Sequence, residues 1–439
     1  MEEEILQQMS LWDYIYPKKK IEKPIRLIEF FAGIGSQFKA LKQLTNQVES
    51  WKICEWAYNS YCCYNAIHIK DFTDYAKDLT KDELIKRISG TSMNYNDPLT
   101  DKQLSKKPIE WLRNAYNNCV ATHNLINIMN VHGKDLEIVD TDKYEYILTY
   151  SFPCQDLSLA GKRQGMATSQ KYGGTRSGLL WEVERILTEL EREREHSTLP
   201  HILLMENVPE VVGQANINDF VKWQNRLEEL GYKNYVEILN AKNYGIPQNR
   251  RRCFMVSILG DYAYNFPIKL KREYRLKDLL EKIVSKKYYL TNEHIERISN
   301  WKAQQKPLEN MINLTGGADT TTPTLTARGA GEEHSGMVLI EESEVMDFDN
   351  KPVEQRGGGS NLRIRKLTPL ETMRLMGFTD EDYQAMRDIG MSDAAIYHMA
   401  GDSIVVTVLM SIFSTLMFDD DRHTKIVKDY IKKGIIENK

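Results

Sequence analysis

Cys154 stands directly after a proline, where an apolar run ends in the stretch YSFPCQDLSLAG (150–161). It therefore lies at the predicted carboxyl end of a strand, the place where open α/β sheets bind their ligands. The segment that follows (161–178) contains five glycines and predicts a loop able to close over a substrate. A single cysteine is most often a small buried hydrophobe. Its alternative role, as a nucleophile, depends on the groups that accompany it.

A carboxylate follows a second predicted strand, HILLMENVPE (201–210), which ends in Glu206 and Asn207 before a proline. Near a thiol, such a carboxylate could act as an acid or as a hydrogen-bond partner, with its pKa raised by burial. Both chemical groups are thus predicted at the carboxyl ends of strands.

A pair of arginines approaches a third predicted strand in the stretch QNRRR (248–252). Gln248, Arg250 and Arg252 occupy alternate positions there, so the period of an extended chain points all three side chains to one face. Because arginine does not lose its proton, the two guanidinium groups supply fixed positive charge and directed donors.

A glycine turn, FFAGIGS (30–36), separates the first predicted strand from a helix and lets the backbone approach a ligand closely. It lacks the full G-x-G-x-x-G spacing of a dinucleotide site. The next predicted strand ends in Glu55 and Trp56, a carboxylate that could accept from ribose hydroxyls and an indole that could stack on adenine. A surface glutamate beside a core tryptophan explains the same pair equally well.

Short apolar runs that alternate with amphipathic stretches predict the elements that hold these groups. The predicted strands are IRLIEFFAGIG (25–35, ending in the glycine turn), VESWKICEW (48–56), YEYILTYSF (144–152), HILLMENV (201–208), YVEILNA (235–241) and RCFMVSIL (252–259). The predicted helices are 36–44, 178–195 and 217–230. This alternation indicates an α/β sheet with parallel strands.

The second half of the chain has a different character. After about residue 265 the sequence becomes rich in charge, glycine and threonine, which predicts a second, smaller domain. Thr368, Pro369 and Glu371 are the residue types expected at the N-cap, first and third positions of a helix. The final apolar run (401–413) has helical length and could pack back on the first domain. Earlier in the chain, 93–108 has the composition of a surface loop.

Composition limits the class of protein. The 439 residues are 41% hydrophobic and 27% charged, as in a soluble globular protein. The six cysteines form no C-x-x-C pair, so neither a structural zinc site nor a disulfide framework is indicated. The N-terminus has no signal-peptide organisation and the longest apolar run is too short to cross a bilayer, so we expect a cytoplasmic protein. A net charge of −4 does not exclude nucleic acid, which needs only one positive face.

In combination, FAGIGS, PCQ, ENV, QNRRR, RKLTPLETMRLMGF and GDSIVV occur in an order that resembles the DNA cytosine-5 methyltransferase family, over roughly residues 25–415. The resemblance implies an α/β fold: the Rossmann-like sheet of S-adenosylmethionine-dependent methyltransferases, with helices on both faces, plus a smaller target recognition domain. The implied domains are 25–268 (catalytic), 269–392 (target recognition and hinge) and 393–420 (a C-terminal helix returning to the catalytic domain).

The resemblance also implies covalent catalysis. Cys154 would attack carbon 6 of a cytosine rotated out of the duplex, while Glu206 would share a proton with nitrogen 3 of the base. Arg252 would contact the carbonyl oxygen of the base, and Arg250 would support the cysteine and its loop. Carbon 5 would take a methyl group from S-adenosylmethionine, and loss of its proton and of the cysteine would release 5-methylcytosine.

For the cofactor, the resemblance assigns the glycine turn to the methionine and adenosine portions, Glu55 to the ribose, Trp56 to the adenine face and Asp135 to the adenine amino group. The expected cofactor residues are Phe31, Ala32, Gly33, Ile34, Gly35, Glu55, Trp56, Asp135, Pro153, Asp402 and Ser403. S-adenosyl-L-homocysteine would be the product, and no metal is expected.

Four residues depart from the usual family pattern. Glu29 stands where Asp is more usual, Ser36 where a third glycine is common, Ser151 where glycine is frequent, and Asp402 where Asn is usual. None of these changes removes a catalytic group.

The region 270–365 lies where the family keeps its target recognition domain, and TPTLTARGAGEEHSG (322–336) resembles the element that approaches the major groove. The residues expected to contact DNA are Gln155, Ser158, Asn207, Gln248, Thr326 and Arg328. The expected partner is double-stranded DNA with a specific short sequence, bound by a monomer with no membrane partner. A cognate restriction endonuclease that acts separately is a further candidate partner.

Three other interpretations remain open at this point. An RNA cytosine methyltransferase would share the chemistry, although a recognition-sized segment at 270–365 argues against it. A dinucleotide oxidoreductase would explain the glycine turn alone. A catalytically silent DNA-binding module would have lost Cys154 or Glu206, and both are present.

Overall fold

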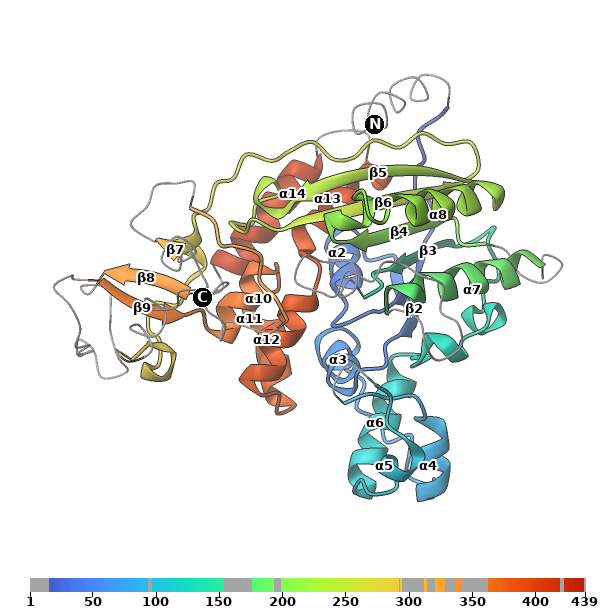
Figure 1. The fold of residues 1–439 in the computed structure, drawn as a ribbon, viewed down its shortest axis with the longest axis horizontal. Coiled ribbons are helices and arrows are strands. Elements are labelled where there is room, and N and C mark those ends of the chain that lie inside the picture. The colour runs from blue at the N-terminus through green and yellow to red at the C-terminus, as the bar shows by residue number, and fades with distance from the viewer. Residues whose placement is uncertain are drawn as a thin grey trace. The chain divides into compact units, whose positions relative to one another are not determined.

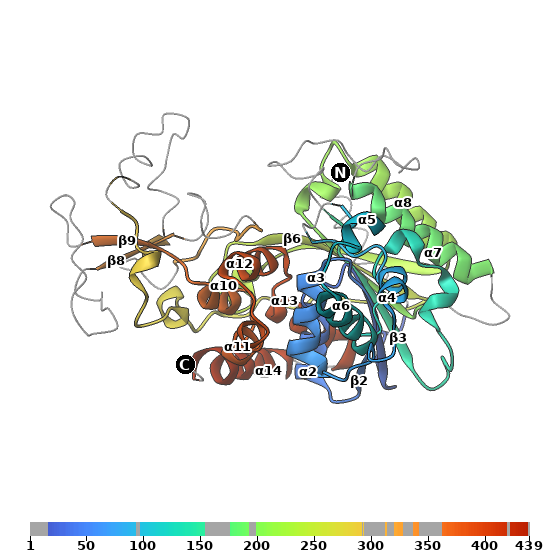
Figure 2. The same cartoon turned by 90° about the horizontal axis from the view of Figure 1, so that it is seen from below.

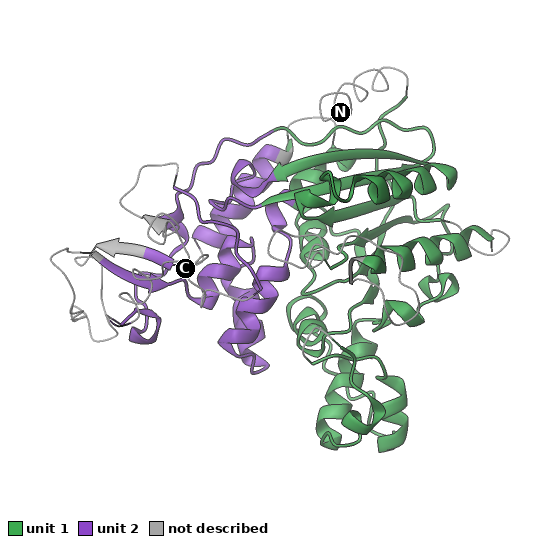
Figure 3. Cartoon of the chain, in the orientation of Figure 1, with its two compact units in different colours: residues 1–239, 251–268, 409–423 green, residues 240–250, 269–408, 424–439 purple. Residues whose placement is uncertain are grey.

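The computed structural model describes residues 16–93, 97–153, 176–192, 199–291, 293, 312–313, 320–327, 337–341, 362–418 and 422–437. The chain divides into two compact units (Figure 3). Unit 1 is Met1–Leu239, Arg251–Ile268 and Leu409–His423, and unit 2 is Asn240–Arg250, Lys269–Val408 and Thr424–Lys439. The domain boundaries expected from the sequence stay a prediction. Four expected site residues lie outside the described residues: Cys154, Gln155, Ser158 and Arg328.

A six-stranded sheet organises unit 1, in the order β2-β1-β3-β4-β6-β5 (Figure 1). Its strands are β1 (Ile25–Phe30), β2 (Val48–Cys54), β3 (Glu145–Tyr150), β4 (Ile202–Asn207), β5 (Tyr232–Asn240) and β6 (Arg251–Leu259). β1 pairs in parallel with β2 and β3, and β3 with β4, but β4 and β6 are antiparallel. The expectation of parallel strands fails at β6. Only residues 241–250 connect β5 to β6, and they contain no crossover helix of the kind that joins parallel strands.

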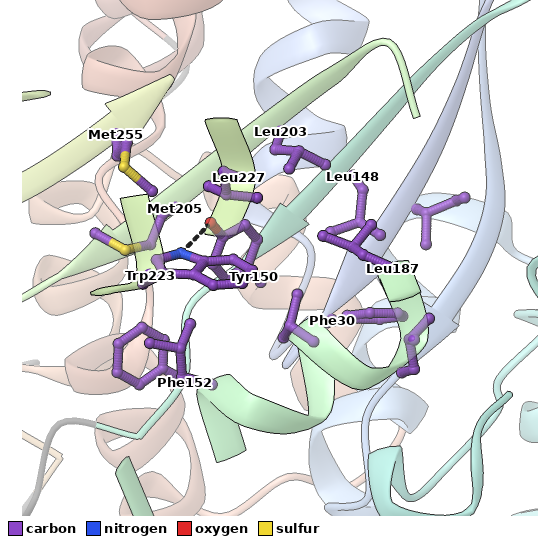
Figure 4. Close-up of a cluster of buried hydrophobic side chains, with 14 of the residues drawn as sticks. Phe30, Leu148, Tyr150, Phe152, Leu187, Leu203, Met205, Trp223, Leu227 and Met255 are labelled. Atoms are coloured by element: carbon purple, nitrogen blue, oxygen red, sulfur yellow. Dashed lines mark hydrogen bonds between the residues drawn. The ribbon is translucent and has the colours of Figure 1, made fainter. Parts of the chain in front are cut away.

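Helices cover both faces of this sheet, which confirms the expected α/β fold. They are α2 (Ser36–Leu44), α3 (Tyr58–Tyr64), α7 (Leu180–Arg192) and α8 (Ile217–Glu229). On one face, apolar side chains at alternate strand positions pack against α7 and α8 around the buried Trp223, whose Nε1 donates to the Tyr150 hydroxyl at 3.1 Å (Figure 4). On the other face, the Glu29 carboxylate accepts from α2 and α3.

A helical insertion separates β2 from β3. It starts with a π-helical turn, η1 (Asn65–Ile69), and continues with α4 (Lys81–Arg87), α5 (Asp101–Leu104) and α6 (Ile109–Ala121) (Figure 2). Its helices share a small core of their own: Ala76, Leu84, Ile88, Leu104, Leu112 and Ala115. The stretch 93–108 is therefore not only loop, since Thr100 caps α5 within it.

Unit 2 holds a small sheet in the order β7-β8-β9 and most of the C-terminal helices. The strands are β7 (Ile312–Asn313), β8 (Met337–Glu341) and β9 (Leu362–Lys366). The helices are α10 (Pro369–Leu375), α11 (Asp380–Asp388), α12 (Asp393–Asp402), α13 (Val406–Met417, in unit 1 from Leu409) and α14 (Arg422–Tyr430). The expected capping box of α10 is confirmed, because Thr368 and Glu371 each accept from the other's backbone N–H.

Short 3₁₀ and π turns complete the described elements: η2 (Ile128–Asn130), η3 (Gly133–Leu136), η4 (Arg176–Leu179), η5 (Pro209–Val212), η6 (Ala241–Asn243), η7 (Leu276–Leu279), η8 (Lys286–Tyr288) and η11 (Ile431–Ile436).

The pair α12–α13 (Asp393–Met417) is long and apolar enough, by length and composition, to cross a membrane. The sequence estimate was shorter because it counted from the GDS motif, which the structure places at the end of α12. Burial argues against a span, since 89% of its apolar window is buried, as in the core helix of a soluble protein. Within unit 1, Ile21 N donates to Leu416 O at 2.8 Å.

Candidate active site

Three strands bring the central polar groups of unit 1 to one edge of the sheet. Ser151 follows β3, Glu206 lies near the end of β4, and Arg252 is the second residue of β6. The ends meet because Tyr150 pairs with Met205, and Glu206 pairs with Phe254. From the resemblance we expected Glu206 and Arg252 to contact one base. The antiparallel direction of β6, which the sequence did not predict, is what brings the start of this strand beside the end of β4.

Glu206 is held by two side chains at this edge. Arg252 Nε lies 3.0 Å from Glu206 Oε1, and the Ser151 hydroxyl donates to Oε2. The residue as a whole is only 6% exposed. A carboxyl group in this position can exchange a proton with a bound planar polar group. The guanidinium beside it can donate a hydrogen bond to the same group. Ser151 was missed as a partner of Glu206, and its only signal was that it replaces a frequent glycine.

Asn207 faces the segment that leads to Cys154. Its Nδ2 donates to Phe152 O at 3.0 Å, and its Oδ1 accepts from Val208 N at 2.8 Å. These bonds fix the backbone between β3 and Pro153, the residue before Cys154. The side chain is buried, so its described contacts are internal, and its expected contact with DNA stays a prediction.

The other cysteines are poor candidates for a nucleophile. The five described cysteines are all buried: Cys54, Cys62, Cys63, Cys119 and Cys253. Burial raises the pKa of each of these thiols, that of Cys119 to about 12. Since the thiolate is the reactive form, these five thiols are unreactive at neutral pH.

The glycine turn and Glu55 meet at the ends of β1 and β2. Gly33 N donates to Glu55 Oε2 and Ala57 N to Oε1, both at 2.8 Å. Gly33 and Gly35 have left-handed backbones, with φ of 54° and 77°. Among the residues that the structure describes, a Cβ on Gly33 would meet nothing within 4 Å, whereas one on Gly35 would lie 2.6 Å from His68 Nε2. The turn is thus backed by protein at Gly35 and leaves room for a ligand at Gly33.

The remaining expected cofactor residues of unit 1 lie in varied surroundings. Phe31 also has a positive φ, 58°, and Ala32 and Ile34 are buried. Trp56 is partly buried next to Glu55. Asp135 lies in η3, where its Oδ2 accepts from His132 N at 2.8 Å. The described contacts of Asp135 therefore do not join it to Glu55 or to the turn.

Glu29 is a buried carboxylate behind the same turn. Burial raises its pKa to about 8, against the lowering effect of hydrogen bonds from the Tyr64 hydroxyl (2.5 Å) and Phe38 N (3.3 Å). The folded chain thus keeps a proton that the unfolded chain releases above about pH 4.5, so this contribution to stability is lost as pH rises toward 8.

We expect Glu29→Gln, which is neutral at every pH, to flatten this dependence. Between pH 5 and 8 the wild type should lose up to about 4 kcal/mol more unfolding free energy than the variant. Urea unfolding of both proteins at pH 5, 6.5 and 8 measures this difference. Parallel stability curves would show that Glu29 is ionised in the fold.

Gln248 and Arg250 precede β6 and belong to unit 2. Gln248 Nε2 donates to Leu375 O at 2.8 Å, and its Oε1 accepts from Leu325 N at 3.2 Å. Arg250 donates to the carbonyls of Leu325 (2.7 Å), Gly401 (2.9 Å) and Ser403 (2.9 Å). The expectation that Gln248, Arg250 and Arg252 share one face assumed an extended chain, but β6 begins only at Arg251.

The two arginines therefore have different described surroundings. Arg252 contacts Glu206 in unit 1, whereas Arg250 binds backbone of the segment that contains Thr326 and of the GDS motif. These contacts give Arg250 a structural task that the sequence did not reveal. Its expected support of Cys154 stays a prediction.

His398 joins the same two segments of unit 2. Its Nδ1 donates to Ala327 O at 3.1 Å, and its Nε2 lies 3.2 Å from Asp402 Oδ2. Burial lowers the pKa of His398, but the hydrogen bond and charge of Asp402 outweigh burial and raise the pKa above its ordinary value. Ser403 donates to Met399 O at 2.7 Å. Among the residues that the structure describes, no group of three or more His, Cys, Asp or Glu could hold a metal ion.

Comparison with known proteins connects this geometry to a family. The model of the C-5 cytosine-specific DNA methylase family matches residues 99–417. The chain is 32% identical over 413 residues to the orphan methyltransferase M.SssI of Spiroplasma monobiae, covering 90% of this chain and 97% of that protein. It is also 32% identical over 403 residues to the type II methyltransferase M2.ScrFI of Lactococcus lactis subsp. cremoris, covering 89% and 99%.

Solved structures agree on the fold. The Dnmt2 methyltransferase of S. pombe superposes with a TM-score of 0.57 at 15% identity, over 89% of this chain and 98% of that one. The family match decides against a dinucleotide oxidoreductase and in favour of DNA over RNA. The chain therefore belongs to the C-5 cytosine-specific DNA methylases and is a DNA (cytosine-5-)-methyltransferase.

Proposed function

We propose that this S-adenosylmethionine-dependent enzyme methylates cytosine through a covalent adduct formed by Cys154. The observation that carries the proposal is the contact of Glu206 with Arg252, 3.0 Å apart, beside the backbone that leads into Cys154. The Watson–Crick edge of cytosine presents nitrogen 3 next to the carbonyl oxygen at carbon 2. A carboxyl group that shares a proton with nitrogen 3 and a guanidinium beside it match these two neighbouring acceptors.

The proposed reaction begins with attack by the cysteine and ends with its release. The Cys154 thiolate bonds to carbon 6, and the ring electrons move toward nitrogen 3, where Glu206 delivers a proton. Arg252 stabilises the negative charge that develops on the carbonyl oxygen. Carbon 5, now nucleophilic, takes the methyl group that S-adenosylmethionine supplies. A base then removes the carbon-5 proton, the sulfur–carbon bond breaks and nitrogen 3 returns its proton to Glu206, which releases 5-methylcytosine and the thiolate.

Attack at carbon 6 requires that the base leave the duplex, because both faces of a stacked base are covered. Asn207 supports this chemistry indirectly by holding Phe152 O, and so the backbone before Cys154. Ser151 orients the Glu206 carboxylate. We assign Arg250 a supporting role toward the cysteine and its loop, on the resemblance alone.

The cofactor assignment rests on the glycine turn and Glu55. The residues present fit an adenosyl group: Gly33 has space above its Cα, and Glu55 lies within 2.8 Å of its N–H. Each carboxylate oxygen of Glu55 can accept a second hydrogen bond, from a ribose hydroxyl. Trp56, Asp135, Pro153, Asp402 and Ser403 complete the proposed cofactor residues, on the resemblance.

The biological role we propose is protection of DNA at one short duplex sequence from a cognate restriction enzyme, inside the cytoplasm and by a monomer. A type II methyltransferase among the relatives supports protection, although another relative is an orphan enzyme. Thr326 and Arg328, with Gln155, Ser158, Asn207 and Gln248, are the proposed DNA contacts.

Expression in a host without cytosine methylation tests directly whether the enzyme methylates one short sequence. We expect mapping of 5-methylcytosine to find one short sequence modified at nearly every copy, and no modification with the Cys154→Ala variant. Methylation without sequence preference would contradict recognition of a specific site. Unmodified DNA from a soluble, well-expressed protein would contradict activity on duplex DNA without a further partner.

A further inference from the structure

The helical insertion between β2 and β3 touches the proposed cofactor site at both of its ends. At its start, His68 Nε2 donates to Ile34 O at 2.8 Å, inside the glycine turn. Near its end, the Asn124 side chain bonds the backbone of Glu55. The two contacts thus reach the two elements that we assign to the cofactor.

Asn124 binds Glu55 in the manner of a neighbouring strand. Its Oδ1 accepts from Glu55 N at 3.0 Å, and its Nδ2 donates to Glu55 O at 2.9 Å. The same Oδ1 accepts from Ile126 N at 2.9 Å. The backbone continues this pairing, since Leu125 N donates to Ile53 O at 2.8 Å. One amide side chain therefore fixes both backbone groups of the residue whose carboxylate faces Gly33.

His68 supports the turn from behind. A carbonyl oxygen only accepts, so the bond to Ile34 O requires the proton of His68 on Nε2. The ring packs edge-on against Phe38 (centroids 5.5 Å apart) and Tyr64 (4.9 Å). The ring also lies close to Gly35, where a Cβ would be 2.6 Å from Nε2, so the turn cannot shift toward the helix without a clash.

Asparagine side chains connect the two ends of the insertion. Asn65, in the same π-helical turn as His68, donates from Nδ2 to Asn118 Oδ1 on α6 at 2.9 Å. Asn118 O in turn accepts from the Thr122 hydroxyl at 2.7 Å, two residues before Asn124. Asn65 is 1% exposed, and a buried, satisfied amide pair holds one geometry.

We infer that the insertion is part of the cofactor site, with His68 and Asn124 as positioning residues that fix the glycine turn and Glu55 for S-adenosylmethionine. The inference rests on the proposed function, in which Glu55 and the turn hold the cofactor. Neither side chain takes part in the chemistry.

The decisive variant is Asn124→Asp in the full chain. It keeps the acceptor for Glu55 N but replaces the donor to Glu55 O by a repelling oxygen. Asn127→Asp is the matched control, because it makes the same charge change three residues later, where the side chain only needs to accept from Met129 N. The probe is S-adenosylhomocysteine, whose neutral sulfur does not respond to the added negative charge as a sulfonium would.

We expect Asn124→Asp to weaken S-adenosylhomocysteine binding by about tenfold, the scale of one lost hydrogen bond. The KM for S-adenosylmethionine should rise to a similar extent, while DNA affinity and the melting temperature change little. Asn127→Asp should match the wild type. A parallel pair, His68→Leu and His68→Gln, should show a loss with leucine and recovery with glutamine, whose amide nitrogen replaces Nε2 as donor.

Glu55→Ala separates failure of this inference from failure of the proposed function. Wild-type binding by Asn124→Asp, with loss in Glu55→Ala, would overturn the inference and leave the function standing. Wild-type binding by Glu55→Ala would overturn the assignment of Glu55 itself. Equal losses of cofactor binding, DNA binding and melting temperature in Asn124→Asp would reduce Asn124 to a general structural role. If Asn124→Asp does not fold, the comparison of His68→Leu with His68→Gln decides. Equal S-adenosylhomocysteine binding by these two variants would refute the inference.

Discussion

Replacing Cys154 with alanine is expected to abolish methyl transfer in a protein that still binds duplex DNA. Without the thiolate no bond forms at carbon 6, and carbon 5 stays too electron-poor to accept a methyl group. The rate should fall by roughly 10⁴-fold or more, as when a covalent nucleophile is removed. Transfer of a radioactive methyl group to DNA measures the rate, and a gel-shift assay measures binding. The matched control is Cys63→Ala, which removes a buried thiol and should keep nearly full activity.

A second measurement tests the adduct itself. With 5-fluorocytosine in the DNA, the final step is blocked, because fluorine cannot leave carbon 5 as a proton does. We expect the wild type to form a complex that survives denaturation, and Cys154→Ala to form none. A stable adduct in the alanine variant would assign the nucleophile to another residue. Normal turnover by that variant would exclude covalent catalysis by Cys154.

Glu206→Gln should have the next largest effect. Glutamine keeps the shape of the side chain and can still contact Arg252 and Ser151, but it cannot pass a proton to nitrogen 3. General acid catalysis contributes roughly 10² to 10⁴-fold, so kcat should fall by that factor while DNA affinity changes little. Single-turnover kinetics at saturating DNA and cofactor isolate this step.

Ser151→Ala provides the comparison for Glu206→Gln. It removes the hydroxyl that donates to Glu206 Oε2 but leaves the carboxylate and its contact with Arg252. We expect a loss of about tenfold or less, the cost of one orienting hydrogen bond. If Glu206→Gln were as active as Ser151→Ala, proton transfer by Glu206 would be refuted.

Local sequence patterns were sufficient to predict the strands of the sheet and the helices that cover it. The helix predicted at 36–44 is α2 (Ser36–Leu44), because the glycine turn starts it and its apolar spacing has a helical period. The strands near Glu206 and Arg252 were predicted for a similar reason, since short buried runs bounded by turns have few alternatives. The reversed direction of β6 was missed because strand direction depends on connection length, which periodicity does not report.

Contacts between residues far apart in the chain could not be predicted from the sequence. Arg250 binds Leu325 and Gly401, which lie 75 and 151 positions away. Asn124 binds Glu55 from 69 positions away, after an insertion whose small core gives no functional signal. Nothing in residue type distinguishes these side chains from ordinary surface asparagines and arginines. Only the folded chain shows that Asn124 and Arg250 donate to backbone carbonyls.

Because Thr326 is a proposed DNA contact, the support of residues 320–327 has a consequence for the proposed recognition of a target sequence. Gln248, Arg250 and His398 hold this segment through the N–H of Leu325 and the carbonyls of Leu325 and Ala327. Every residue type supplies the carbonyls, and every type except proline supplies the N–H. The exposed Thr326 side chain can therefore be exchanged without loss of these three anchors, provided the backbone keeps its path. If Thr326 contacts DNA as proposed, libraries that randomise Thr326 and spare Gln248, Arg250 and His398 are the economical route to enzymes with new sequence preferences.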